Sequence, residues 1–163
     1  MNRPRRPGFV FREAQLSDIG DVIRLYQQLH PHDPGIGEHE GSAILQQILE
    51  CPYLHLFVLE DDAGVVASTY LNIVPNLSRS AMPYAVIENV VVDESLRSKG
   101  VGKSIMFETL DFAWNAGCYK AMLMTGSRDP STHGFYRACG FSGDAKTAYL
   151  ARPLMTYEQS GMT

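Results

Sequence analysis

The feature of this sequence that most constrains its fold is a glycine-containing turn between an apolar run and a helical pattern. The run Val90-Val91-Val92 predicts a strand, and the apolar spacing after Gly100 predicts a helix. Glycine lets a backbone approach a ligand closely because it has no Cβ, and the first-turn N–H groups of a helix attract anions. We therefore predict a phosphate-binding turn. Its residues are Arg97, Ser98, Lys99, Gly100, Val101, Gly102, Lys103 and Ser104.

Two common glycine loops do not fit this turn. The phosphate loop of nucleoside triphosphatases requires Gly five residues before its Gly-Lys-Ser, and Arg97 stands at that position before Gly102. A dinucleotide-binding fingerprint requires a small residue three positions after Gly102, because the helix packs closely on the strand there, and this residue is Ile105. Both classes of nucleotide-binding protein are therefore disfavoured.

A second motif lies one strand and one helix further along the chain, where Phe135-Tyr136 is followed by Gly140-Phe141. Together, the two motifs resemble the GNAT superfamily of N-acetyltransferases, and the resemblance extends over residues 84–141. Within that superfamily, residues 87–92 and 117–120 are most similar to eukaryotic glucosamine 6-phosphate N-acetyltransferases. The resemblance implies an acetyl-CoA-dependent enzyme and a homodimer. It also implies a mixed α/β fold of three layers, in which helices flank a mostly antiparallel central sheet that splays apart.

The local patterns predict alternating helices and strands in a single domain over residues 1–163, with residues 1–8 as a flexible tail. Strands are predicted at residues 9–12, 54–60, 65–74, 85–93, 119–125 and 147–151. Helices are predicted at residues 19–29, 41–50, 100–116 and 130–139, the third with Trp114 in its apolar stripe. A hairpin turn is predicted at residues 61–64.

Composition and apolar pattern limit the partners that the protein can bind and its expected location in the cell. The net charge of −4 argues against a nucleic-acid partner, which would favour a basic patch. No apolar stretch is long enough to cross a membrane, and no apolar segment of a signal peptide follows the N-terminus, so we expect a cytoplasmic protein. The three cysteines have no C-x-x-C spacing, which predicts neither a disulfide framework nor a metal site.

Acetyl transfer to an amine requires a base, because amines arrive protonated. Glu88 interrupts the apolar run of the strand at residues 85–93, and strict alternation would project it with Val86, Val90 and Val92. Burial raises the pKa of a carboxylate and suits it to general-base catalysis, directly or through a water. The alternative is that Glu88 is a partly exposed strand residue without a catalytic role.

The resemblance implies roles for further residues. Tyr136 aligns with the tyrosine that protonates the leaving thiolate, with a packed aromatic side chain as the alternative. The pantetheine arm would run along Val90, Val91 and Val92, and a backbone N–H near Val91 or Val92 would bind the oxyanion. Asp129 stands where many members have an asparagine that contacts pantetheine. Arg97 and Lys99 either add charge to the phosphates or are solvated.

The acceptor is expected to be a primary amine of a small molecule that attacks the thioester directly in a ternary complex. Sugar-phosphate amines lead the candidates, and Arg79 or Arg128 could pair with the phosphate; aminophosphonates, polyamines, amino acids and aminoglycosides follow. The loop at residues 30–40 is rich in His, Asp and Glu but matches no metal motif, so we interpret it as solvated. Two alternatives remain open: acetylation of protein N-termini, and a non-catalytic module that senses acyl-CoA.

Overall fold

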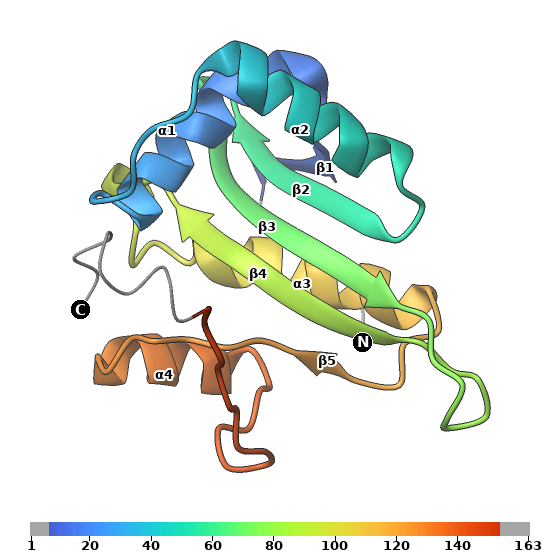
Figure 1. The fold of residues 1–163 in the computed structure, drawn as a ribbon. Helices are drawn as coiled ribbons and strands as arrows, with labels where there is room; N and C mark the ends of the chain where they lie inside the picture. The colour runs from blue at the N-terminus through green and yellow to red at the C-terminus, as the bar shows by residue number, and fades with distance from the viewer. Residues whose placement is uncertain (1–6, 154–163) are drawn as a thin grey trace. The chain divides into compact units, whose positions relative to one another are not determined.

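The computed structural model describes residues 7–153, which form two compact units, residues 7–127 and 128–153. The first unit contains a five-stranded sheet in the order β1-β2-β3-β4-β5 together with three α-helices, and the second contains one helix (Figure 1). Residues 1–6, most of the predicted flexible tail, lie outside the described part of the chain. The single domain over the whole chain stays a prediction.

The element bounds confirm most of the predicted elements to within a few residues. The strands are β1 (Val10–Glu13), β2 (Leu54–Asp61), β3 (Gly64–Val74), β4 (Tyr84–Val92) and β5 (Ala121–Met122). The α-helices are α1 (Ile19–Leu29), α2 (Glu38–Glu50), α3 (Val101–Asn115) and α4 (Pro130–Ala138), and short 3-10 turns lie at η1 (Leu16–Asp18) and η2 (Glu94–Leu96). The first four strands pair antiparallel, and β5 pairs parallel with β4. The predicted mixed α/β class with a mostly antiparallel sheet is confirmed.

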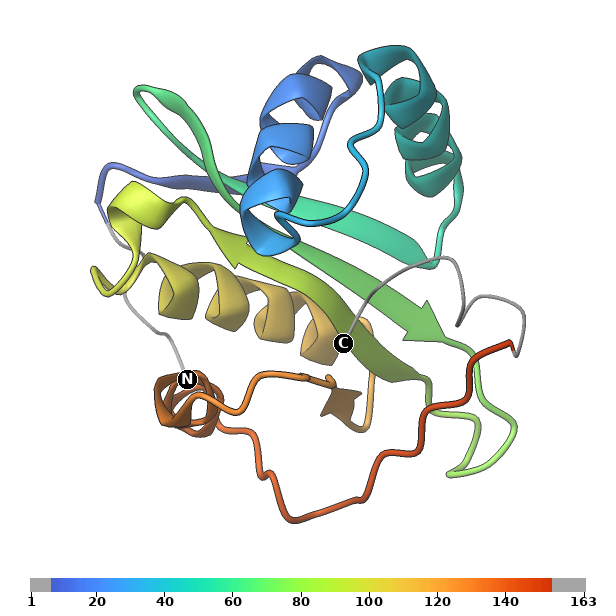
Figure 2. The same ribbon diagram turned by 60° about the vertical axis from the view of Figure 1, so that its left-hand side comes forward.

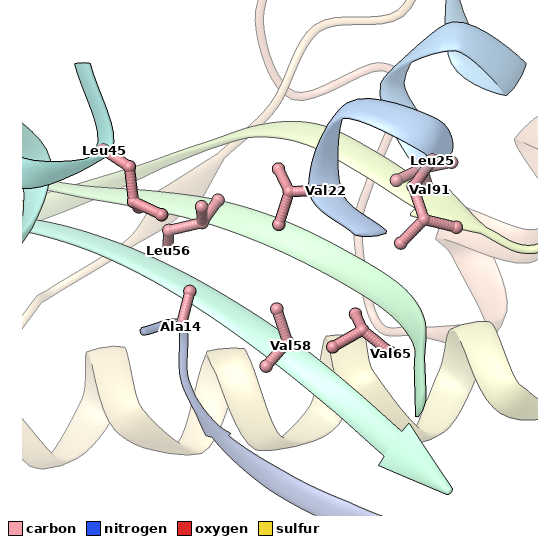
Figure 3. Packing of buried hydrophobic residues seen from close by; sticks show 8 residues of the cluster. All are labelled: Ala14, Val22, Leu25, Leu45, Leu56, Val58, Val65 and Val91. Carbon is pink, nitrogen blue, oxygen red and sulfur yellow. The ribbon is translucent and has the colours of Figure 1, made fainter. Parts of the chain in front are cut away.

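Helices cover both faces of this sheet, as Figure 2 shows for α1 and α2 on one face and α3 on the other. One cluster joins α1 and α2 to the sheet, and its buried members are Ala14, Val22, Leu25, Leu45, Leu56, Val58, Val65 and Val91 (Figure 3). A second cluster joins α3 to the sheet, and its buried members are Leu59, Val66, Ala67, Val101 and Ile105. We call the side of the sheet with the first cluster the α1/α2 face and the side with the second cluster the α3 face.

Two predicted elements start or end elsewhere. Helix α2 begins at Glu38 rather than at residue 41. Gly37 is its N-cap and accepts the first helical hydrogen bond, and the acidic residues of the first turn interact favourably with the helix dipole. The strand predicted at residues 119–125 is reduced to Ala121–Met122, since only these residues pair with β4. β-propensity alone does not supply the neighbouring strand that a ladder requires.

The last predicted strand, at residues 147–151, is wrong. These residues have no regular secondary structure, and Tyr149 and Leu150 within them are 93% and 73% exposed. The apolar side chains of the segment predicted a strand, but within the second unit no described strand pairs with it. Without a partner the backbone groups of the segment cannot form a ladder.

Helix α3 buries most of its predicted apolar stripe, but Trp114 is 45% exposed, and a buried hydroxyl pair adds a polar contact between the helix and the sheet. The Oγ1 atoms of Thr69 on β3 and Thr109 on α3 lie 2.7 Å apart, and both residues are fully buried. Thr109 Oγ1 donates to the carbonyl of Ile105 at 2.8 Å. Since this bond uses its proton, the Thr69 hydroxyl donates to Thr109. The two threonines therefore depend on each other.

We expect Thr109→Val to cost about 1–3 kcal/mol of unfolding free energy, because it leaves the Thr69 hydroxyl buried without an acceptor. Thr69→Val should cost less, since Thr109 keeps its bond to Ile105. The double variant should cost less than the sum of the two single variants. Urea denaturation of the four proteins measures this cycle, and strictly additive costs would contradict the pairing.

Candidate active site

The central feature of the site is a β-bulge in β4. Ser68 of β3 pairs with Val91, and Tyr70 pairs with Glu88. Two residues of β4, Asn89 and Val90, therefore lie opposite the single residue Thr69 of β3. The backbone of Asn89 has φ +50°, in the left-handed region. Asparagine tolerates this region better than most residues. A bulge of this kind bends the strand and shifts its alternation by one residue.

The bulge corrects the predicted orientation of Glu88. Val91 packs in the core of the α1/α2 face, whereas Val92 packs against the α3 face. Glu88 stands opposite Tyr70, which packs against the α1/α2 cluster, and directly opposed residues share a face. Glu88 therefore shares its face with Val91, and the expectation that it projects with Val90 and Val92 is wrong. The extra residue between them reverses the alternation.

Polar side chains that sequence reasoning missed surround this part of the α1/α2 face. Burial raises the pKa of the Tyr26 phenol on α1, and hydrogen bonding to the side chains of Asn89 and Ser68 opposes that rise. Burial also raises the pKa of Tyr70, the partner of the half-buried Glu88. Ser68 Oγ is fully buried and makes no hydrogen bond of normal distance and angle. Tyr26 occupies an apolar helical position in the sequence, so its polar role had no sequence signal.

Beyond its first residues, β4 has an open backbone edge. Within residues 7–127, β5 pairs only with Ala85 and Val86, and the Ala85 N–H donates to the Lys120 carbonyl at 2.9 Å. At the other end of β4, the Asp93 N–H donates to Val66 of β3 at 2.8 Å. Because bonding directions alternate along an antiparallel strand, the Val91 N–H is directed to β3 and the Val92 N–H away from it. Such an edge can pair with an extended ligand.

The phosphate-binding turn predicted from the sequence follows this edge directly. Ser98 and Gly100 have φ +60° and +83°, and α3 begins at Val101. The first helical bond runs from the Ser104 N–H to the Gly100 carbonyl at 3.2 Å, so the three N–H groups before Ser104 in α3 have no partner within the helix. The side chains of Arg97, Ser98, Lys99 and Lys103 are exposed. Amides at a helix start with exposed cations beside them suit an anionic ligand.

Arg97 makes a specific contact in this turn. Its Nε donates to the Val92 carbonyl at 3.2 Å, at the end of β4. The side chain therefore lies against the open edge of the strand rather than extending freely into solvent. Val101 and Ile105, which follow in α3, are buried and fix the helix start on the sheet.

The second unit carries the two other predicted site residues. Asp129 is the N-cap of α4, where its Oδ1 accepts from the Ser131 N–H at 2.8 Å, and hydrogen bonds from Ser131 lower its pKa. Tyr136 is half-buried, with its ring centroid 5.0 Å from that of Phe135 and 6.1 Å from that of Phe141. The aromatic pair and the following Gly-Phe thus form one aromatic cluster inside this unit.

Two structural features are absent from residues 7–153. Among them, no group of three or more His, Cys, Asp or Glu side chains is arranged to hold a metal ion. None of the described helices is both long and apolar enough to cross a membrane.

Comparisons with known proteins test the predicted family and fold. The model of the Acetyltransferase (GNAT) family matches residues 21–141. A glucosamine 6-phosphate N-acetyltransferase of Arabidopsis thaliana is 32% identical over 144 residues, which cover 85% of this chain and 83% of that protein. Glucosamine 6-phosphate N-acetyltransferase 1 of Oryza sativa subsp. japonica is 28% identical over 134 residues, 80% of this chain and 79% of that protein.

Solved structures share the fold. A putative acetyltransferase from Agrobacterium tumefaciens has a TM-score of 0.84 and 41% identity, with 88% of this chain and 99% of that chain covered. The crystal structure of glucosamine-6-phosphate N-acetyltransferase from Arabidopsis thaliana has a TM-score of 0.77 at 24% identity, with 90% and 98% covered. The resemblance inferred from the two motifs is therefore confirmed, and this chain belongs to the GNAT family as an acetyltransferase enzyme.

Proposed function

We propose that this acetyltransferase transfers the acetyl group of acetyl-CoA to a primary amine of a small molecule. The observation that carries the proposal is the arrangement of β4. Beyond Val86, one edge of this strand has no paired strand among residues 7–127, its bulge sets Glu88 and Val91 on the α1/α2 face, and a short turn leads from it to a helix N-terminus. An extended thioester with a pyrophosphate at one end matches the edge and the helix start.

Each part of the cosubstrate has a proposed partner. The amides of Val101, Gly102 and Lys103 would hold the pyrophosphate, with charge from Lys99 or Lys103 and from Arg97. The pantetheine arm would pair with the edge at Val90–Val92. We assign the oxyanion donor to the Val92 N–H, because the Val91 N–H is directed to β3.

The proposed chemistry is direct attack within a ternary complex. Glu88 accepts a proton from the ammonium, directly or through a water, and the free amine attacks the thioester carbonyl carbon. The C–N bond forms, the nitrogen, which then carries a positive charge, loses its second proton to solvent, and the C–S bond breaks as the tetrahedral intermediate collapses. Tyr136 donates a proton to the departing thiolate and recovers one from solvent. The role of Tyr136 rests on its alignment within the family, and that of Asp129, beside pantetheine, does so as well.

The leading acceptor is the amine of a sugar phosphate. The relatives from Arabidopsis and Oryza are named glucosamine 6-phosphate N-acetyltransferases, and their matches cover more than three quarters of their lengths. This support comes from those proteins and not from a sugar-binding residue of this chain. From the resemblance we also expect a homodimer, and from the apolar pattern of the sequence a cytoplasmic location.

Release of free CoA thiol from acetyl-CoA across a panel of amines tests this proposal. The panel contains glucosamine 6-phosphate, glucosamine, an aminoalkylphosphonate, a polyamine, amino acids, an aminoglycoside and peptides with free N-termini. We expect turnover with glucosamine 6-phosphate well above that with glucosamine, since a phosphate adds charge-assisted contacts. A peptide as the best acceptor would favour N-terminal acetylation. No turnover with any amine, while acetyl-CoA still binds, would favour the sensing module.

Glu88→Gln should lower kcat by about 10²- to 10⁴-fold while the affinity for acetyl-CoA is kept, because only proton removal is lost. Tyr136→Phe should lower kcat as well. Glu40→Gln, an exposed change in the first turn of α2, is the matched control and should leave kcat unchanged. Wild-type turnover by both site variants, measured by thiol release, would remove Glu88 and Tyr136 from the mechanism.

Gly100→Ala should raise KM for acetyl-CoA, since a Cβ at φ +83° costs about 1–2 kcal/mol and distorts the amides of the turn. Gly117→Ala is the matched control because Gly117, just past the other end of α3, has φ +81° and no neighbouring atom within 4 Å of an added Cβ. Both variants should lose similar stability in thermal unfolding. Only the first should weaken acetyl-CoA binding, and equal KM values for the two would contradict the phosphate-binding role of the turn.

A further inference from the structure

The residue that joins β4 to the phosphate-binding turn is Asp93, and both of its carboxylate oxygens are bound. Oδ2 accepts from Arg24 Nη1 and, at 3.2 Å, from Gln28 Nε2, and both of these donors lie on α1. Oδ1 accepts from the N–H and the hydroxyl of Ser95 at 3.1 and 2.6 Å. These hydrogen bonds hold the pKa of Asp93 well below its usual range. Asp93 is therefore a fixed anion between α1 and the turn.

The two α1 residues are held in place from the other side. Arg24 Nη2 donates to the Val65 carbonyl on β3 at 2.7 Å and to Asp21 Oδ1 at 3.0 Å. Gln28 uses both ends of its amide, because its Oε1 accepts from the Glu94 N–H at 2.9 Å. Arg24 thus ties α1 to β3 and to the residue that follows β4, and Gln28 binds two successive residues of the corner at Asp93–Glu94.

This corner determines where the turn begins. The Leu96 N–H donates to the Asp93 carbonyl at 2.9 Å, and Leu96 packs against the α3 face. Residues 97–104 follow immediately. Backbone amides bind an anion well only when they are already oriented, because ordering a free segment costs roughly 1–2 kcal/mol per residue. A corner held by side-chain bonds reduces that cost.

We propose that Arg24 and Gln28 are positioning residues for acetyl-CoA, which hold the corner at Asp93–Glu94 and thereby orient the amides of residues 97–104. The proposal rests on the proposed function, since it assumes that these amides bind the pyrophosphate. It assigns a cosubstrate role to α1, a helix that contributes no residue to the turn itself. A purely structural pair would behave differently: Arg24 is 42% exposed, and exposed ion pairs contribute little stability.

The test compares ligands with and without a pyrophosphate. The variants are Arg24→Met and Gln28→Met, which remove the polar groups; methionine matches the length of Gln28 and keeps the unbranched apolar stem of Arg24. We expect the dissociation constant of CoA, measured by calorimetry, to rise about tenfold for Arg24→Met, or about 1.4 kcal/mol of binding free energy, and less for Gln28→Met. KM for acetyl-CoA should rise in parallel while kcat changes less than twofold. With S-acetylpantetheine, which has the thioester but no pyrophosphate, kcat/KM should match the wild type.

Arg12→Met is the matched control. Arg12 also binds two carboxylates, with Nη1 2.6 Å from Asp18 Oδ2 and Nη2 2.6 Å from Glu60 Oε2, but it joins β1 to η1 and β2. Its loss should lower the thermal unfolding midpoint and leave the CoA dissociation constant unchanged. Arg24→Lys keeps a cation beside Asp93 and loses the fork that also reaches Val65, so it should recover part of the affinity.

The outcomes separate this inference from the function on which it rests. Unchanged CoA affinity in both methionine variants, with a wild type that binds CoA, would overturn the positioning role alone. Equal losses with acetyl-CoA and S-acetylpantetheine would also overturn it, since they would indicate a general structural defect. A wild type that does not bind CoA would overturn the proposed function and this inference together. Gln28→Met keeps the test valid if Arg24→Met does not fold.

Discussion

The site depends on one backbone irregularity, the bulge at Asn89–Val90. Without the extra residue, the side chains of β4 would alternate regularly, and Val91 would not enter the core on the side that Glu88 faces. The bulge brings the side chains of Glu88 and Val91 to the same face of the sheet, where Glu88 is half-buried and Val91 is buried. A single left-handed residue thus decides which side chains face α1 and α2 and which face α3.

Helix α1 connects the parts of the first unit through two kinds of contact. Its apolar side, with Val22 and Leu25, covers the sheet, while Tyr26 adds a phenol beside the bulge. Its polar side binds the end of β4 through Arg24 and Gln28. The same eleven-residue helix therefore contacts both the strand that carries Glu88 and the corner before the phosphate-binding turn.

Local patterns predicted the elements whose signals lie within a few residues. The turn at Gly100, the helix after it and the hairpin turn at residues 61–64 all agree with the structure. The bulge was not predicted, because Asn89 is not a glycine and regular alternation was expected throughout the strand. The strand predicted at residues 147–151 was wrong because a local signal was present without a partner: its residues favour a strand, but no described strand pairs with it. The predicted place of Trp114 in the apolar stripe of α3 was wrong as well, because helical periodicity does not distinguish the edge of the core from the solvent-exposed surface.

The sequence by itself determined the family, the helix start at Gly100 and the presence of a carboxylate in the central strand. These follow from residue types at short spacing, where backbone freedom and apolar periodicity act locally. Tertiary structure alone decided the face on which Glu88 lies, the short pairing of β5 with only the first residues of β4, and the contacts of Asp93 with α1. Arg24 and Asp93 are 69 residues apart, and no local rule relates them. Such contacts form only when packing of the apolar faces brings distant segments together, and that packing depends on the whole chain.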